Sequence, residues 1–268
     1  MSKTTAARST ANRAKNSRLL EGAARTGYVT NGILHLLIGG IALGVAFGGS
    51  GSADQSGALR GIASAPGGVF VLWLVVVGMA GLALLQVLEA LLERGSGKEQ
   101  WMARAKAAGK AVAYLAVGLT ALPFALGGSG GGGGAEQGFS AQLLASPGGV
   151  VLLIAVGLAV LAIGVYYVVK GAKQKFVDDI RLPTGTARKG VLAVGTAGYI
   201  AKGVAIGIVG ILFIVAAVTA DSSQAAGLDG ALKSLTELPF GVALLAIVAL
   251  GLILFGVYCF ARARLARL

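Results

Sequence analysis

Four polar side chains interrupt apolar stretches of this sequence and are the residues best placed for chemistry: Asn31, His35, Lys110 and Lys202. Asn31 and His35 are four residues apart, so a helix would place them on one face. A lone ammonium in an apolar segment is costly, and it marks either an anion-attracting site or a side chain that extends to a polar boundary. Both interpretations stay open for the lysines. For His35, a hydrogen-bonded packing role is favoured over a proton relay.

Signatures of enzymatic chemistry are absent from the sequence. It contains no His/Cys/Asp cluster, no Gly-x-Ser-x-Gly elbow and no His-Glu-x-x-His pair. The single cysteine, Cys259, allows no intramolecular disulfide and is too few ligands for a metal, so we expect it to pack. The glycine run at 127–138 lacks the Lys-Ser/Thr of a phosphate loop and is expected to be flexible. We predict no catalytic residues, no metal and no cofactor.

The composition indicates what surrounds these residues. Of the 268 residues, 56% are hydrophobic and only 13% are charged, against about 25% charged in soluble domains. Six apolar runs follow one another, at 28–48, 67–92, 110–127, 148–169, 190–218 and 239–260. A bilayer is crossed by roughly 20 such residues in a helix. We predict an all-α polytopic membrane protein with six transmembrane helices, in which 188–200 forms a separate interfacial helix.

The basic residues alternate between the segments that join these runs. Of 23 Lys and Arg residues, 19 lie in the N-tail, the second and fourth connecting segments and the C-tail. The other connections contain only Arg60 and Lys233. Because basic segments stay in the cytoplasm, both termini are predicted to be cytoplasmic. No signal-peptide apolar region precedes the first run.

The net charge of +12 raises the question of a nucleic-acid partner. The basic residues, however, cluster beside the apolar runs, where anionic lipid head groups attract them. Glu89, near the end of the second run, would pair with a cation or meet the same head groups. We therefore predict anionic membrane lipids as partners, with another membrane protein or self-association as a further option, and no nucleic acid.

An internal repeat organises the chain. Three first-span segments align, ARTGYVTNGILHLLIG from Ala24, ARAKAAGKAVAYLAVG from Ala103 and GTAGYIAKGVAIGIVG from Gly195. Each second span opens after a proline, in APGGVFVLW, SPGGVVLLI and LPFGVALLA. The alignment equates Asn31, Lys110 and Lys202, and it sets Tyr114 and Ile206 opposite His35, which disfavours a threefold proton path. Each repeat is predicted to be a helical hairpin, and three parallel hairpins can form a pseudo-threefold bundle or lie side by side.

These repeated segments resemble the domain-of-unknown-function 1206 family of bacterial membrane proteins. The resemblance covers nearly the whole chain beyond the N-tail, and it implies six spans in three tandem repeats and a bacterial inner-membrane location. It implies no activity and no catalytic residues. The second repeat departs from the pattern, since Lys106-Ala107 stands where the others have Gly27-Tyr28 and Gly198-Tyr199.

Glycines spaced by four residues predict close helix packing. The stripes are formed by Gly40, Gly44 and Gly48 in the first span and by Gly203 and Gly207 in the fifth. Their alternative role would be to leave space for a small permeant or a lipid tail.

Together these patterns predict a cytoplasmic N-tail at 1–24 and repeats at 25–95, 96–175 and 176–268, the last with a short basic C-tail. The favoured function is a non-catalytic, partner- or lipid-binding membrane protein. The alternative is a transport or pore protein for small solutes or anions, with Asn31, Lys110 and Lys202 at its cytoplasmic mouth. Few acidic residues lie within the spans, and this disfavours coupled transport.

Overall fold

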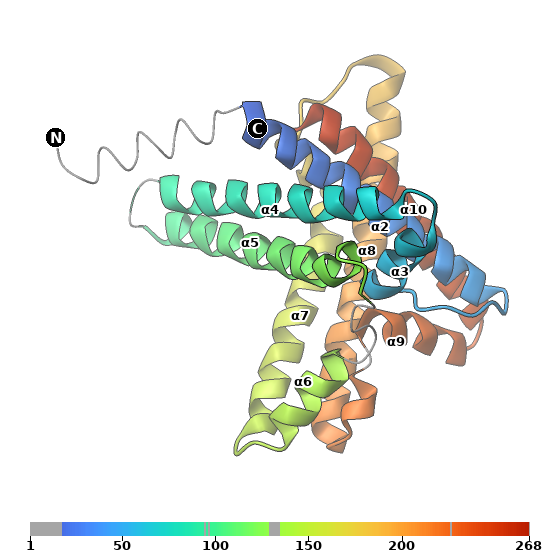
Figure 1. The fold of residues 1–268 in the computed structure, drawn as a ribbon. Helices are drawn as coiled ribbons and strands as arrows, with labels where there is room; N and C mark the ends of the chain where they lie inside the picture. The colour runs from blue at the N-terminus through green and yellow to red at the C-terminus, as the bar shows by residue number, and fades with distance from the viewer. Residues whose placement is uncertain (1–17, 94, 96, 129–134, 226, 268) are drawn as a thin grey trace.

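The computed structural model describes residues 18–93, 95, 97–128, 135–225 and 227–267. Six long helices run through these residues (Figure 1): α2 (Arg18–Ala46), α4 (Gly68–Leu92), α5 (Lys98–Ala125), α7 (Gly149–Ala172), α8 (Gly185–Thr219) and α10 (Gly241–Leu265). Most of the predicted N-tail, 1–17, and residues 129–134 of the predicted flexible glycine run lie outside the described residues.

All six long helices are long and apolar enough to cross a membrane. The predicted all-α fold with six spans is therefore confirmed. One detail differs, because 188–200 is not a separate helix but the first part of α8, a continuous helix of 35 residues. Such a helix is about 52 Å long, well beyond the roughly 30 Å of a bilayer core. Lys202 lies at its middle.

Each repeat also contains a short helix in the segment that the sequence predicts only as a connection between two spans. These are α3 (Gln55–Ser64), α6 (Ala135–Leu144) and α9 (Gly227–Ser234), and the 3-10 turns η1 (Lys175–Asp179), η2 (Ser222–Gln224) and η3 (Leu235–Glu237) complete the described elements. The Asp54 carboxylate caps α3 by accepting from the Gly57 N–H at 2.8 Å. The Asp229 carboxylate accepts from the Ala53 N–H at 2.8 Å and so joins α9 to the start of α3. We call this side of the molecule the short-helix end.

The return into each second span uses one turn, repeated three times. The residue after each proline has a left-handed backbone, with φ of 75° at Gly67, 77° at Gly148 and 61° at Phe240. The following glycine donates its N–H to the carbonyl three residues back, at 2.9 Å for Gly68, 3.0 Å for Gly149 and 2.8 Å for Gly241. Left-handed conformations cost L-residues free energy, so Phe240 is strained where glycine stands in the other two repeats.

The most extensive helix contacts join neighbouring repeats. These antiparallel pairs are α4 with α5, α7 with α8, and α10 with α2. Figure 1 shows the three pairs running in three different directions. The last pair joins the third repeat back to the first, so the pairs follow one another around a ring, as a pseudo-threefold arrangement requires.

Equivalent small residues form the contact in each pair. A Cβ at Gly32 of α2 would lie 2.9 Å from the Gly256 carbonyl oxygen of α10. A Cβ at Gly203 of α8 would lie 2.6 Å from the Gly164 carbonyl oxygen of α7. The corresponding residues of α5 and α4, Ala111 and Ala83, are both buried. In the α2–α10 and α7–α8 pairs, close backbone approach at this repeated position therefore sets the spacing of the helices.

Of the two predicted glycine stripes, one packs against a neighbouring helix and the other is exposed. Gly203 and Gly207 lie against α7, where a Cβ at Gly164 would come within 2.6 Å of the Gly207 nitrogen. Gly40, Gly44 and Gly48 are exposed, and a Cβ at any of them would meet nothing within 4 Å. Their predicted packing role within the chain is therefore wrong. The close contacts of α2 are made on another face, by Gly27, Gly32 and Gly39. The spacing of glycines identifies a stripe of small residues, but it does not indicate which face of the helix a neighbouring helix covers.

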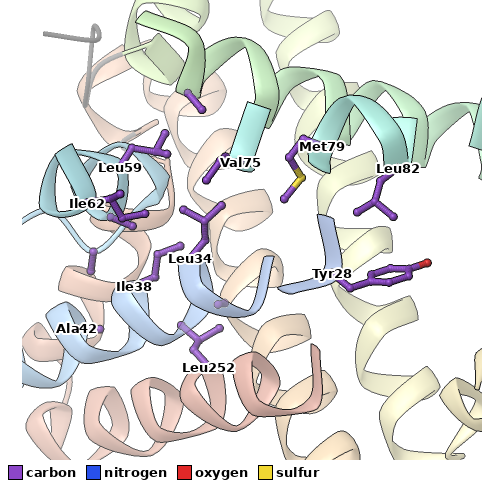
Figure 2. Close-up of a cluster of buried hydrophobic side chains, with 14 of the residues drawn as sticks. Tyr28, Leu34, Ile38, Ala42, Leu59, Ile62, Val75, Met79, Leu82 and Leu252 are labelled. Atoms are coloured by element: carbon purple, nitrogen blue, oxygen red, sulfur yellow. The ribbon is translucent and has the colours of Figure 1, made fainter. Parts of the chain in front are cut away.

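Apolar side chains fill the space between α2, α4, α10 and α3 (Figure 2). Leu34, Ile38, Leu72, Met79 and Leu82 are each at most 2% exposed. The packing continues to Leu59 and Ile62 of α3 at the short-helix end. This part of the interior is a dry core, in which burial of apolar surface is the main stabilising contribution.

Candidate functional site

A cluster of charged side chains lies at the other side of the molecule, which we call the basic end: the α2 start, the α4–α5 turn, the α7–α8 connection and the α10 end. At its centre the Asp179 carboxylate of η1 accepts a hydrogen bond from Lys170 Nζ at 2.6 Å. Arg262 Nη2 of α10 lies 3.5 Å from the same carboxylate oxygen. We call Lys170, Asp179 and Arg262 the charged triad. It contains two cations for one anion.

Backbone and aromatic contacts hold the triad in place. The α10 end is tied to η1, since Arg181 donates its N–H to the Leu265 carbonyl at 2.7 Å. Arg262 Nη1 donates to the Tyr199 hydroxyl at 3.4 Å, and its guanidinium lies 4.6 Å from the Tyr28 ring centroid. Lys170 Nζ lies 5.4 Å from the Tyr199 ring centroid. Cation–π contacts partly compensate for the removal of these cations from water.

The cations lower the pKa of Asp179 below its usual value. Burial alone would raise the pKa, because it disfavours the charged carboxylate. The positive charges of Arg262 and Lys170, together with the hydrogen bond from Lys170, outweigh burial. The carboxyl group is therefore ionised at neutral pH.

Lys202 lies among aromatic rings rather than beside a carboxylate. Its ammonium is 4.3 Å from the Phe255 ring centroid of α10 and 5.4 Å from the Tyr167 ring centroid of α7. Within the described part of the chain, no Asp or Glu oxygen lies within 4.0 Å of its nitrogen. Lys202 thus adds a positive charge to the interior without an ion-pair partner.

Asn31 and His35 of α2 also contact α10, and His35 shares the Phe255 ring with Lys202. The His35 ring is tilted against Phe255, with centroids 4.7 Å apart. Its Nδ1 lies 2.8 Å from the Asn31 carbonyl oxygen, which can only accept, so this nitrogen carries the proton. Asn31 Nδ2 donates to the sulfur of the buried Cys259 at 3.4 Å. Both polar side chains therefore have partners within the helix packing.

The fourth predicted residue, Lys110, lies apart from the other three, exposed on α5. The structure thus brings Asn31, His35 and Lys202 together around Phe255 and Cys259, and it does not place Lys110 with them. Glu89 accepts a hydrogen bond from Gln86 at 2.8 Å. The described residues contain no group of three His, Cys, Asp or Glu side chains arranged to hold a metal.

A polar path across the molecule would have to continue from Lys202 toward the short-helix end. Between α2, α4 and α10, such a path would meet the apolar core that includes Leu34, Ile38 and Met79 (Figure 2).

Comparison with known proteins agrees with the threefold architecture. The family described as Domain of Unknown Function (DUF1206) matches the chain three times, at residues 26–93, 105–174 and 197–266. The chain belongs to the DUF1206 family. It is 31% identical over 241 residues to Uncharacterized protein YxxB of Bacillus subtilis (strain 168), covering 87% of this chain and 86% of the relative. No solved structure matches it.

Each DUF1206 unit contributes one charged residue to the same position, 23 residues after its return proline. These residues are Glu89, Lys170 and Arg262. The charged triad is not evident from the sequence pattern, because Lys170 and Arg262 fall among the basic residues that orient the chain. The spacing from the prolines could have identified their equivalence. Asp179 carried no comparable signal, since it follows another aspartate in a polar connection.

Proposed function

We propose that this multi-pass membrane protein is non-catalytic and binds anionic lipid head groups at its basic end, facing the cytoplasm of a bacterial inner membrane. The observation that carries the proposal is the excess of cations there. The charged triad holds two cations for one carboxylate. Phosphate groups of lipids would supply the missing negative charge.

The distribution of charge in the sequence supports this function. The predicted cytoplasmic segments contain 19 of the 23 basic residues, and a basic residue near an anionic bilayer surface contributes about 1 kcal/mol of attraction. Anionic lipid would stabilise the folded protein by preferential binding to it.

The test uses the purified full-length protein in detergent, mixed with either phosphatidylglycerol or phosphatidylcholine. We expect phosphatidylglycerol to raise the Tm by several degrees more than phosphatidylcholine does. Because the attraction is electrostatic, the difference should shrink as salt is raised from 0.05 to about 0.5 M. An equal rise in Tm with both lipids would argue against the proposal.

The alternative, a path for anions or small solutes, draws on Lys202 in the bundle interior. The dry core of α2, α4 and α10 argues against it. Anion flux into liposomes that contain the parent or the Lys110→Ala/Lys202→Ala variant tests it directly. We expect no flux above empty liposomes in either case. Flux that depends on these lysines would replace the lipid-binding proposal with transport.

A further inference from the structure

The two long helices of a repeat meet at what we call a seam, and the three seams differ. α2 packs on α4 in the first repeat, and α8 packs on α10 in the third. Between the described residues of α5 and α7, in the second repeat, there is no extended interface. Figure 1 shows α5 and α7 running in different directions. The ring is therefore open at one of its three equivalent seams.

The sequence of the second repeat departs from the other two at the seam. The first seam closes where Gly27 lies against Leu82, and the third closes where a Cβ at Gly198 would lie 2.6 Å from the Phe255 backbone. The repeat alignment places Lys106 at this position in the second repeat. A lysine side chain does not fit such a close backbone approach. Ala159 of α7 also stands where α4 has Gly78 and α10 has Gly251, two glycines that lie in close contact across the closed seams.

The open seam leaves an apolar face without cover from the described chain. Leu82 is 0% exposed and Phe255 is 3% exposed, but their equivalent Ile163 on α7 is 48% exposed. The next turn repeats the pattern. Leu85 is 3% exposed and Tyr258 is 1% exposed, whereas Tyr166 is 45% exposed.

Unpaired cations flank this face at the basic end. Lys106 Nζ reaches across from α5 and lies 5.6 Å from the Tyr166 ring centroid. Lys110 follows one turn later on the same side of α5 and is exposed. Among the residues that the structure describes, neither lysine has a carboxylate oxygen within 4.0 Å. The seam thus combines a positively charged end with an apolar surface.

We propose that an anionic glycerophospholipid occupies the α5–α7 seam, with its phosphate at Lys106 and Lys110 and an acyl chain along Ile163. This inference rests on the proposed function and assigns it a site. A phospholipid satisfies both halves of the surface at once, since its phosphate neutralises the lysines and its acyl chain covers the apolar face. A second copy of this chain would bring a like-charged basic end and leave the lysines unpaired.

The test compares lipid retention by native mass spectrometry of the full-length protein in detergent with equimolar phosphatidylglycerol and phosphatidylcholine. The variants are Lys106→Gly, which restores the residue of the other repeats, and Lys106→Gln, which removes the charge alone. Lys189→Gly, at an exposed position of α8 away from the seam, is the matched control. We expect each Lys106 variant to lower affinity for phosphatidylglycerol about fivefold or more, and the control to keep the parent value.

A spin-label distance between Leu119→Cys of α5 and Leu158→Cys of α7, in a Cys259→Ala background, reports the seam itself. We expect a shorter distance in Lys106→Gly and the parent distance in Lys106→Gln.

If the parent shows no preference for phosphatidylglycerol, the proposed function fails. If the parent prefers it but the Lys106 variants retain it equally, or lose it no more than Lys189→Gly does, the seam is not the site although the proposed function stands. Retention of a second copy in place of lipid would also overturn the assignment.

Discussion

Asp179 is the residue on which the charged triad depends, because it is the carboxylate shared by Lys170 and Arg262. Asp179→Asn would leave both cations without this negatively charged partner. Removing one partner of a buried ion pair costs about 3 kcal/mol, so we expect a clear fall in Tm in detergent. The neighbouring Asp178 is exposed, and Asp178→Asn is the matched control. Equal Tm values for the two variants would show that the triad contributes little to stability.

The same residue predicts an acid dependence. The pKa of Asp179 is lowered from 3.8, because the charges of Arg262 and Lys170 outweigh the effect of burial. A lowered folded-state pKa means that the ion pairs contribute fully above the unfolded value and are lost as pH falls through the folded value. The Tm difference between the parent and Asp179→Asn should therefore be constant above about pH 5 and narrow below pH 3.8. A difference that persists unchanged at pH 2 would contradict this electrostatic origin.

At the scale of helices, small residues decide which faces approach closely. Gly203→Ala would place a Cβ against the α7 backbone, and overpacking of this kind costs about 1–3 kcal/mol. Gly40→Ala, at an exposed position with open space, should instead be neutral or stabilise α2 by up to about 1 kcal/mol. Thermal unfolding of both variants measures the contrast. A fall in Tm for Gly40→Ala like that for Gly203→Ala would indicate that this stripe packs after all.

The return turns give a second prediction for elements. Phe240 has φ of 61° where the other repeats have glycine, and Phe240→Gly should gain about 1 kcal/mol from relief of this strain. Phe240→Ala removes the same side chain and keeps the strained conformation, so its Tm should lie below that of Phe240→Gly. Identical Tm values would mean that the turn stores no strain at this position.

How much the sequence could predict also differs by element. The six long helices follow from apolar runs that only a membrane-spanning helix explains. The short helices α3, α6 and α9, of 10, 10 and 8 residues, carry no such signal because they are short and mix polar with apolar residues. Lys202 and His35 stand out as rare polar residues in apolar runs. The Arg262–Asp179 contact cannot be predicted from the sequence, because it depends on the end of α10 lying beside η1 in the folded protein.

For the whole molecule, the repeats predict a ring, and the departure at Lys106 predicts where the ring differs. The three equivalent repeats and this departure are both evident in the sequence. It could not show that helices of neighbouring repeats make the larger contacts, since hairpin connectivity indicates order along the chain and not the extent of packing. The molecule is therefore a pseudo-threefold ring of helices with one open seam, between the described residues of α5 and α7.

The most direct test measures the three seams at equivalent, exposed positions. Spin-label pairs would be placed at Gly40→Cys with Val77→Cys, Leu119→Cys with Leu158→Cys, and Ile211→Cys with Leu250→Cys, each in a Cys259→Ala background. Pulsed dipolar spectroscopy of the full-length protein in detergent then gives three distances. With the seam open, the α5–α7 distance should be longer than the α2–α4 and α8–α10 distances, which should agree with each other. Three equal distances would contradict the open seam.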